Sequence, residues 1–272
     1  MKKFLLLICL IFITCTSAHS EQLKFIQVTD AHFDSSNEYS IKVLKSMVND
    51  VNNQNNISFV VFTGDNINRA SEYDLKYFLN IVSNLKVPYY IVLGNHDVCK
   101  STGLSKKKYY EIVKKHKSFY PQGTPNYLFK KDGFVFLIVD GSKEFIPGPS
   151  GYYVPDTLIW VDNCLAKYKN TPVIIFQHYP IEYPEGSEGR ADTHKTYKAE
   201  DYRALVNYHK NVVAIFSGHF HVNWEEMKNG VYHVSSPSLL SKPNAYKIVE
   251  VAKTEGSKPI VFTMLKNFEV KK

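Results

Sequence analysis

Cysteine is scarce in this chain, with four in 272 residues. Cys9 and Cys15 lie within the first twenty residues, so only Cys99 and Cys164 belong to the rest of the chain. Two cysteines permit a disulfide in an exported protein but do not require one, and both states stay open. The sequence also lacks a Gly-x-Ser-x-Gly elbow, a phosphate-binding glycine loop and a Cys-x-x-Cys pair. The chemistry that these motifs mark is therefore not indicated.

No motif for nucleic-acid binding is present, because the chain has no Arg-rich helix, zinc-finger spacing or aromatic-glycine strand. Internal repeats and low-complexity linkers are absent too, so residues 21–272 are expected to form one domain. Hydrophobic residues make up 44% of the chain and aromatics 14%, enough to fill a sizeable core. The net charge of +7 favours an anionic substrate or surface. The lysines are scattered, however, and fit a solvated basic face equally well.

Residues 1–20 have the organisation of a secretory signal peptide. A basic start precedes the apolar run Phe4–Ile13, which is too short for a permanent bilayer anchor. Small residues offer cleavage after Ala18 or Ser20. A secreted or periplasmic location follows. The alternatives are an uncleaved membrane anchor and a lipoprotein acylated at Cys15.

Short apolar runs alternate with amphipathic stretches, which predicts β-α-β units. Lys131-Asp132-Gly133 predicts a hairpin turn, and Ser71 is the expected cap of a helix. The last three strands are expected to form a closing antiparallel run. The expected strands are Lys24–Thr29, Ser58–Phe62, Tyr89–Leu93, Tyr127–Lys130, Phe134–Val139, Val173–Phe176, Val212–Phe216, Val231–Val234, Tyr246–Val251 and Ile260–Leu265. The expected helices are Ser40–Asn53, Ser71–Leu85, Lys106–Ser118 and Pro155–Lys169.

Five polar segments follow apolar runs, at positions where several strands of a sheet can direct side chains to one point. They are Asp30-Ala31-His32, Gly64-Asp65-Asn66, Gly94-Asn95-His96-Asp97, Gln177-His178-Tyr179 and Gly218-His219-Phe220-His221. Each segment alone is a weak signal, since a single core histidine is more often structural than a ligand. Together they supply the hard oxygens and imidazole nitrogens that a two-metal site needs, including carboxylates able to bridge two ions.

The set resembles the calcineurin-like metallophosphoesterase superfamily, and more specifically its small single-domain members related to class III cyclic-nucleotide phosphodiesterases. The resemblance covers about Phe25–Pro237. It implies an α/β fold, a four-layer αββα sandwich of two mixed β-sheets flanked by helices. It also implies two ions of iron, manganese or zinc. Asp30, His32 and His221 would hold the first ion, Asn95, His178 and His219 the second, and Asp65 would bridge both.

The same resemblance implies that His96 is catalytic, beside the scissile phosphate, and that a metal-bridged hydroxide attacks phosphorus. Asn95 and Arg69 would also contact the substrate; alternatively, Arg69 is an exposed arginine at a helix start. One position departs from the pattern. Asn68 stands where purple acid phosphatases have an iron-binding tyrosine, and where protein phosphatases have the aspartate that orients the catalytic histidine. A tyrosine-ligated enzyme is therefore disfavoured, and the support of His96 is left open.

The sequence thus predicts an exported dinuclear phosphoesterase that hydrolyses small phosphate esters, with phosphodiesters preferred. The alternatives are a phosphomonoesterase, a sphingomyelinase-like enzyme acting on lipid headgroups at a membrane surface, and a non-catalytic scaffold. The long segment Tyr179–Tyr197 is either a lid or a mobile loop, and its His194 is expected to be solvated. His116 and His209 are also expected to be solvated, whereas His233 is expected to be structural. Oligomeric state is left open.

Overall fold

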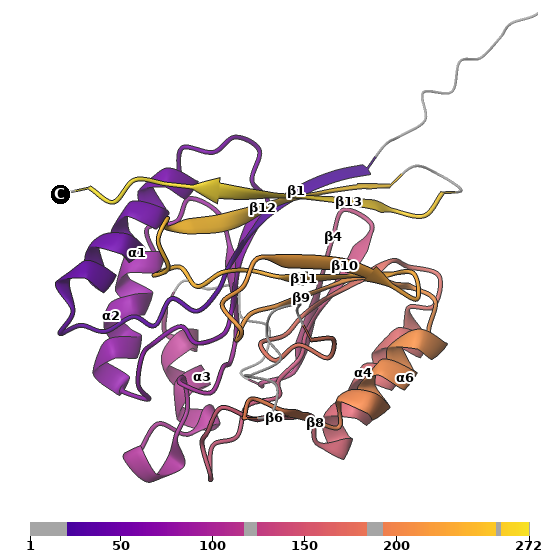
Figure 1. Cartoon of the computed structure of the whole chain (residues 1–272), viewed down its shortest axis with the longest axis horizontal. Helices are drawn as coiled ribbons and strands as arrows, with labels where there is room; N and C mark the ends of the chain where they lie inside the picture. Colours follow the sequence, from indigo (N-terminus) through magenta and orange to yellow (C-terminus); the bar gives the residue numbers. More distant parts are fainter. Residues whose placement is uncertain (1–20, 117–123, 184–192, 254–256, 272) are drawn as a thin grey trace, which may run out of the picture.

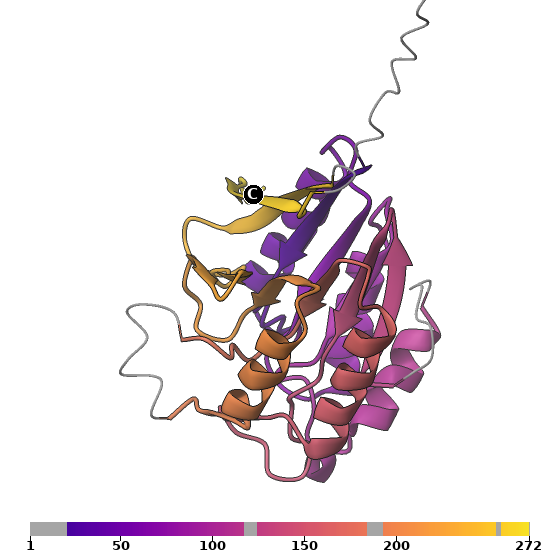
Figure 2. The same cartoon turned by 90° about the vertical axis from the view of Figure 1, so that its right-hand side faces the viewer.

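The computed structural model describes residues 21–116, 124–183, 193–253 and 257–271 (Figure 1). The predicted leader, 1–20, lies outside them, as do part of the Tyr179–Tyr197 segment and the end of the helix predicted to reach Ser118. Two mixed sheets face one another, and helices cover both outer faces (Figures 1 and 2). The four-layer sandwich is therefore confirmed. Among the described residues, no helix has the length and apolar character needed to cross a bilayer.

The first sheet has the strand order β13-β12-β1-β2-β3. Its strands β1, β2 and β3 run parallel, so their carboxyl ends reach the same edge of the sheet. Strands β12 and β13 are antiparallel, as predicted for the end of the chain. The strands are β1 (Glu21–Val28), β2 (Phe59–Thr63), β3 (Tyr89–Val92), β12 (Ala245–Lys253) and β13 (Ile260–Asn267).

Three helices pack on the outer face of this sheet: α1 (Glu38–Val51), α2 (Glu72–Val82) and α3 (Lys106–Lys114). A short 3-10 turn, η1 (Lys100–Thr102), precedes α3. The predicted cap is confirmed, since the Ser71 side chain accepts a hydrogen bond from the backbone N–H of Asp74. These helices begin where a side-chain oxygen can replace the missing backbone acceptor, which is why their starts were predicted within about two residues.

The second sheet has the strand order β10-β11-β9-β7-β5-β4. The predicted hairpin joins β4 and β5 through Asp132 and Gly133, both with positive φ, as a type I′ turn requires. The prediction that the last three expected strands form an antiparallel run is partly wrong, because the strand at Val231–Ser235 lies in this sheet and runs parallel to β9. The strands are β4 (Tyr127–Lys131), β5 (Phe134–Ile138), β7 (Val173–Phe176), β9 (Val212–Ser217), β10 (Trp224–Lys228) and β11 (Val231–Ser235).

Helices α4 (Pro155–Lys167) and α6 (Ala199–Tyr208) cover the outer face of the second sheet. Pro155 opens α4, as predicted, because its missing N–H is not needed in the first turn. A parallel pair of two-residue strands, β6 (Gly151–Tyr152) and β8 (Thr196–Tyr197), lies beside these helices. The sequence prediction missed α6, β6, β8 and β10.

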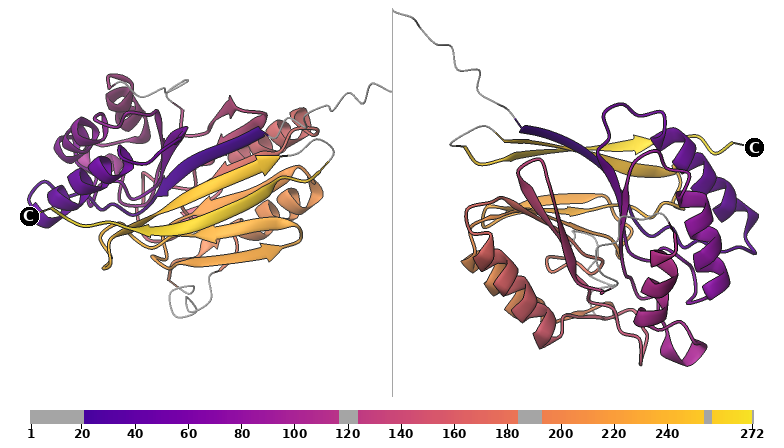
Figure 3. Two further views of the ribbon diagram at one scale, coloured as in Figure 1. Left: turned by 90° about the horizontal axis from the view of Figure 1, so that it is seen from above. Right: turned by 180° about the vertical axis from the view of Figure 1, so that it is seen from behind.

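The two sheets face one another (Figure 3). Aromatic side chains fill the space between them. Phe25 and Phe59 stack at 4.9 Å between ring centroids, and Phe176 and Phe216 meet Phe25 edge-on at 5.4 Å each. Such pairs resist sliding, because both the area they bury and the ring geometry favour one arrangement. This layer therefore fixes the carboxyl ends of β1, β2, β7 and β9 relative to one another.

Cys99 and Cys164 are both free in the structure. Cys164 is buried on α4, and burial raises its pKa to about 11. The sequence left open whether these two cysteines form a disulfide, and the structure shows them unpaired.

Candidate metal centre

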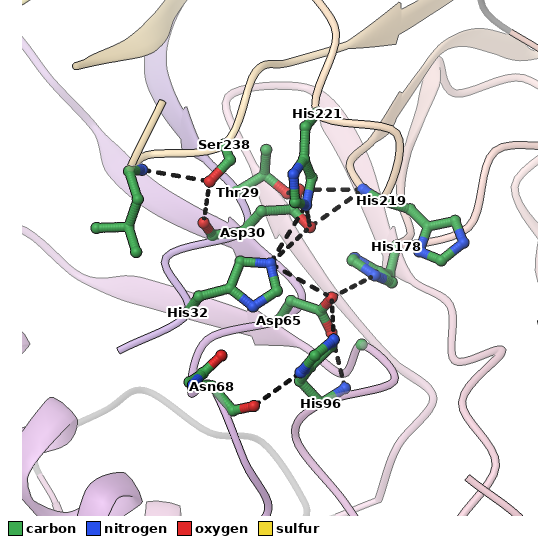
Figure 4. A network of polar contacts seen from close by, with 12 residues as sticks. Thr29, Asp30, His32, Asp65, Asn68, His96, His178, His219, His221 and Ser238 are labelled. Carbon is green, nitrogen blue, oxygen red and sulfur yellow. Dashed lines mark hydrogen bonds and ion pairs between the residues drawn. The ribbon is translucent and has the colours of Figure 1, made fainter. Parts of the chain in front are cut away.

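The five polar segments meet at the carboxyl ends of β1, β2, β3, β7 and β9 (Figure 4). Within each of three groups, one ligand atom per residue lies within 4.8 Å of the others. The groups are Asp30, His32 and His221; His32, Asp65 and His96; and Asp65, His178 and His219. The first and third groups match the two ligand sets that the resemblance implies, apart from Asn95, and Asp65 lies between them.

Asp65 directs one carboxylate oxygen at three imidazoles. Its Oδ2 lies 3.3 Å from His178 Nε2, 3.8 Å from His32 Nε2 and 4.0 Å from His96 Nε2. Its Oδ1 accepts a hydrogen bond of 2.9 Å from the backbone N–H of His96. One oxygen is thus tethered by the protein while the other faces the imidazoles from both ligand sets, which is the position that a bridging carboxylate needs.

The two carboxylate oxygens of Asp30 also have separate contacts. Its Oδ2 accepts hydrogen bonds from Thr29 Oγ1 at 2.7 Å and from the backbone N–H of His219 at 3.0 Å. Its Oδ1 lies 3.2 Å from His221 Nε2 and 3.9 Å from His32 Nε2. Ser238 also donates to the Asp30 backbone carbonyl at 2.7 Å, so the main chain is held as well. Asp30 therefore presents an oriented oxygen to the first group.

The histidines are oriented by contacts on their ring nitrogens. Nδ1 of His178 donates to the Thr63 carbonyl at 2.9 Å, so its Nε2 faces Asp65. Fixing one ring nitrogen by a carbonyl is how proteins set the tautomer and direction of a metal ligand. His32 Nε2 and His221 Nε2 lie only 3.2 Å apart, a hydrogen-bonding distance at which one nitrogen is the donor and the other the acceptor.

The backbone of this region is in a conformation that L-residues avoid. Left-handed φ values occur at five of the predicted ligands, namely Asp30 (51°), His32 (39°), Asp65 (50°), His219 (73°) and His221 (58°). Each such residue costs roughly 1–3 kcal/mol unless its surroundings hold it, and these residues cluster at functional sites. The strain is thus concentrated where the strand ends turn their side chains inward.

Glycines allow the segments to approach closely. A Cβ on Gly94 would lie 2.1 Å from Asp65 Oδ1, and a Cβ on Gly218 would lie 2.0 Å from Thr29 Oγ1. Real Cβ atoms do not come this near to other heavy atoms, so neither position accepts a side chain without displacing an oriented carboxylate or its tether. These two glycines are therefore part of the site's construction.

The protonation states follow from burial and neighbouring charges. Burial alone would raise the pKa of Asp30, but His221 outweighs it and lowers the pKa to about 2. The pKa of Asp65 is likewise lowered against burial, chiefly by His178. Burial lowers the pKa of His32, and that of His219 to about 3. Two carboxylates and two neutral imidazoles thus face the site in the form that binds cations.

Two buried polar atoms support a metal at this place. Asn95 Oδ1 and His219 Nε2 are inaccessible to solvent, and neither has a hydrogen-bond partner among the described residues. A buried polar group without a partner costs about 1–3 kcal/mol. Both belong to the set expected for the second ion, and an imidazole nitrogen and an amide oxygen are suitable donors for a divalent cation. The residues therefore fit a dinuclear centre, whose metals the donor types leave unspecified.

Metal binding is expected to release protons. Burial would lower the pKa of His178, but the Asp65 carboxylate raises it to about 9, so the metal-free ring is protonated near neutral pH. A metal ion requires the neutral ring, so at about pH 7.5 binding should displace roughly one proton or more, and affinity should rise with pH. Calorimetric titration of the chelator-treated protein in buffers of different ionisation enthalpy measures this number. Equal heats in all buffers would contradict it.

His96 is held by a backbone group. Its Nδ1 donates to the carbonyl oxygen of Asn68 at 2.7 Å, which leaves Nε2 directed toward Asp65. The Asn68 side chain points elsewhere and donates to Asp34 Oδ2 at 3.2 Å. The group that orients His96, which the sequence left open, is therefore the main-chain carbonyl of Asn68. This hydrogen bond does not require an aspartate side chain at position 68.

Asp97 does not orient His96 but braces the neighbouring loops. Its buried carboxylate accepts hydrogen bonds from the backbone N–H groups of Asn66, Ile67 and Gly94, and from the Asn66 side chain. Burial and Asp65 together raise its pKa to about 7. Asp97 thus ties the loop carrying Asp65 to the loop carrying His96.

Arg69 lies at the edge of this region. Its side chain is 81% exposed, and its guanidinium lies 3.9 Å from Asp34 Oδ2. That distance marks a weak surface ion pair. Its role in substrate binding stays a prediction, as do the individual roles of the other site residues.

The prediction for His194 is wrong. This half-buried histidine packs against the site, with ring centroids 5.1 Å from His219 and 6.4 Å from Phe220. His209 is not solvated either, because its Nε2 lies 2.6 Å from Asp162 Oδ1 and its side chain is 10% exposed. His116 is half-buried beside the Ile112 carbonyl. His233 is buried on β11, and burial lowers its pKa to about 4.

The family model for calcineurin-like phosphoesterases matches residues 23–223. The chain belongs to the calcineurin-like phosphoesterase family. This calcineurin-like phosphoesterase is therefore a hydrolase of phosphoric esters, with aspartates and histidines positioned to bind metal. The recognition made from five short segments is confirmed.

Several relatives of this calcineurin-like phosphoesterase are named as phosphodiesterases. It is 26% identical to the "Probable glycerophosphodiester phosphodiesterase GpdQ" of Arcobacter nitrofigilis, over 72% of this chain and 71% of that one. It is 24% identical to a "Probable cyclic nucleotide phosphodiesterase" of Psychrobacter arcticus, over 80% of each chain. The crystal structure of a dimetal phosphatase from Danio rerio superposes with a TM-score of 0.65 at 16% identity, over 89% of this chain and 98% of that one.

Sequence reasoning missed several residues that build the centre of this phosphoesterase. Thr29 and Ser238 tether Asp30, and the Asn68 carbonyl orients His96. Thr29 directly precedes a predicted ligand, so its hydroxyl was a readable signal. A main-chain carbonyl carries no sequence signal, and Ser238 is more than 200 residues away from its partner.

Proposed function

We propose that this protein is an exported hydrolase of small phosphodiesters that uses two metal ions. The observation that carries the metal chemistry is the position of Asp65, whose free carboxylate oxygen faces the imidazoles from both ligand groups. When bound, two ions would polarise a phosphoryl oxygen and lower the pKa of a bound water. A non-catalytic scaffold is disfavoured, since every predicted ligand position is filled by a ligand-type residue.

The chain's own residues supply orientation and a proton. His96 Nδ1 is committed to the Asn68 carbonyl, so Nε2 is the nitrogen available to a substrate. Its side chain is 39% exposed, which leaves that nitrogen accessible at the mouth of the site. A group placed this way can donate a hydrogen bond to a non-bridging phosphoryl oxygen or a proton to the leaving oxygen. His96 would thus act on the substrate rather than on the metals.

The preference for diesters rests on the relatives, several of which are named as cyclic-nucleotide or glycerophosphodiester phosphodiesterases. The test is a panel of aryl phosphodiester, aryl phosphomonoester, 3′,5′-cyclic nucleotide, glycerophosphodiester and phosphocholine ester substrates, each with manganese, iron or zinc. We expect the highest kcat/KM on a diester. A higher kcat/KM on the monoester would indicate a phosphomonoesterase instead. A higher kcat/KM on phosphocholine esters would indicate a hydrolase of lipid headgroups.

His194 is expected to affect substrate use more than metal binding. Its ring packs on His219 from the side of the loop that follows β7, so it forms a wall of the site. Replacing it with alanine should lower kcat/KM for the best diester by about tenfold, the effect of losing one positioning contact. Steady-state kinetics and metal analysis check this. A loss of bound metal as large as the loss of activity would contradict it.

Export is proposed from the leader-like sequence at residues 1–20. Its test is N-terminal sequencing and cell fractionation of the natively expressed protein. We expect a chain that begins after Ala18 or Ser20 and lies outside the cytoplasm. A chain that begins at Met1 in the cytoplasm would overturn export, and a Cys15→Ala variant distinguishes an acylated form from a cleaved one.

A further inference from the structure

A cavity of about 690 Å³ lies at the end of the sheets opposite to the metal centre. The metal centre follows the last residues of β7 and β9, whereas this cavity includes residues that precede their first residues, such as Pro172 and Asn211. Its apolar lining includes Val212, Met227 and Val261. Lysines line it as well. They are Lys169, Lys210, Lys253 and Lys258.

A second hollow adjoins the first and extends the basic surface. The two share Thr171 and Lys253, and the second adds Lys130 and Lys131. Among the residues that the structure describes, Asp132 is the single acidic residue in the two linings. We call these six lysines, Lys130, Lys131, Lys169, Lys210, Lys253 and Lys258, the basic end. Like charges at this density repel one another, and a negatively charged partner would relieve the repulsion.

Apolar side chains project from the edge strand next to the basic end. Ile260, which lines the cavity, is 57% exposed, Phe262 is 59% exposed and Met264 is 54% exposed. They alternate along β13 and so share one face of the strand. Met227, also in the cavity lining, is 62% exposed. Basic residues beside exposed aromatic and aliphatic ones are the combination that binds the interface of an anionic bilayer.

The N-terminal segment joins the fold at the same place. Glu21, the first residue of β1, is paired with Lys253 of the basic end. Figure 1 shows the start of β1 beside the end of β12, on the side of the molecule away from α1, α2 and α3. The twenty residues that precede Glu21 include the apolar run Phe4–Ile13. Cleavage after Ala18 or Ser20, as proposed above, removes this run, so the basic end would dock through its own side chains.

We propose that the basic end docks on the surface of an anionic phospholipid bilayer, which leaves the metal centre facing solution. Each lysine near such a surface strengthens partitioning about fivefold. A second copy of the chain fits less well, because two basic ends would repel one another across a symmetric interface. The proposal does not depend on which phosphate ester the enzyme hydrolyses.

The test is co-sedimentation of the leader-free chain, residues 21–272, with phosphatidylcholine vesicles, with and without phosphatidylglycerol. We expect tighter binding to the anionic vesicles, lost on going from about 0.05 M to about 0.5 M salt as the charges are screened. The Lys130→Gln, Lys169→Gln, Lys210→Gln, Lys258→Gln variant should bind them about 600-fold more weakly, at about fivefold for each lysine. A matched variant changes four exposed lysines of α1, α3 and the α3 C-cap, Lys45→Gln, Lys107→Gln, Lys114→Gln and Lys115→Gln, and should bind like the wild type.

A variant that binds more tightly provides a further test, because misfolding would not be expected to increase charge-dependent binding. Asp132→Asn removes an acid from the lining of the second hollow, and asparagine suits the left-handed turn with Gly133. It should bind the anionic vesicles up to about fivefold more tightly. Hydrolysis of a soluble aryl ester should be unchanged in all variants. Equal binding to both vesicle types, equal losses in the two four-lysine variants, or a concentration-dependent dimer that the basic-end changes abolish would overturn the proposal.

Discussion

Replacing Asp65 with alanine is expected to lower kcat/KM by at least about 10³-fold, beyond the roughly 10–100-fold that loss of an outer-shell partner costs. Its carboxylate faces imidazoles of both ligand sets, so its removal would take away the oxygen ligand placed to serve both ions. It also leaves His178 without the carboxylate that raises its pKa. The measurements are steady-state kinetics on an aryl diester and metal content per chain.

Two comparisons separate charge from shape in this result. Asp65→Asn keeps the size of the side chain and one oxygen, so it should retain more of the fold's stability than alanine while losing most activity. Asp201→Ala removes an exposed carboxylate that forms an ion pair with Lys198 and should leave activity unchanged. An Asp65→Ala protein with two metals and near wild-type turnover would exclude the bridging role.

Replacing His96 with alanine should lower kcat about 10²–10⁴-fold, the range for a positioned proton donor. Metal content should remain close to that of the wild type, because its expected role is beside the ions rather than on them. The loss should be larger for an alkyl than for an aryl leaving group, since an alkoxide needs protonation more. Equal losses for both leaving groups would point to charge stabilisation, and a loss of metal would point to a ligand.

Asn68 provides the matched control for His96. Because the histidine is held by the Asn68 backbone carbonyl, Asn68→Ala preserves the hydrogen bond and should cost less than about tenfold in kcat. A loss as large as that of His96→Ala would show that the side chain, through Asp34, does the positioning.

Much of the fold was predictable because its signals are local. Apolar runs located β2, β3, β5 and β7 within about two residues, and Ser71 capped the helix that it was predicted to cap. Helix α6 was missed because its first turn follows Lys198, a left-handed residue with no side-chain cap. The sheet to which Val231–Ser235 belongs depends on pairing with β9, a contact that strand propensity does not specify.

The site was predictable for a different reason, since ligand residue types follow strand ends in a fixed order. Its geometry was not. The hydrogen bonds that leave one oxygen of Asp30 and one of Asp65 facing the imidazoles come from Thr29, His96 and His219, two of them through backbone N–H groups. The place of His194 was missed because a loop histidine reveals no direction until the strands on either side are positioned.

The left-handed backbone at Asp30, His32, Asp65, His219 and His221 has a consequence for protein engineering. At each of these positions glycine would relieve conformational strain, so selection for stability alone would erase the side chains that make the protein useful. Metal binding and conformational stability therefore place opposing demands on the same five residues. Substituting glycine at these five positions to raise thermal stability would therefore remove the side chains expected to bind metal. Stabilising substitutions should instead be made on surfaces remote from the strand ends.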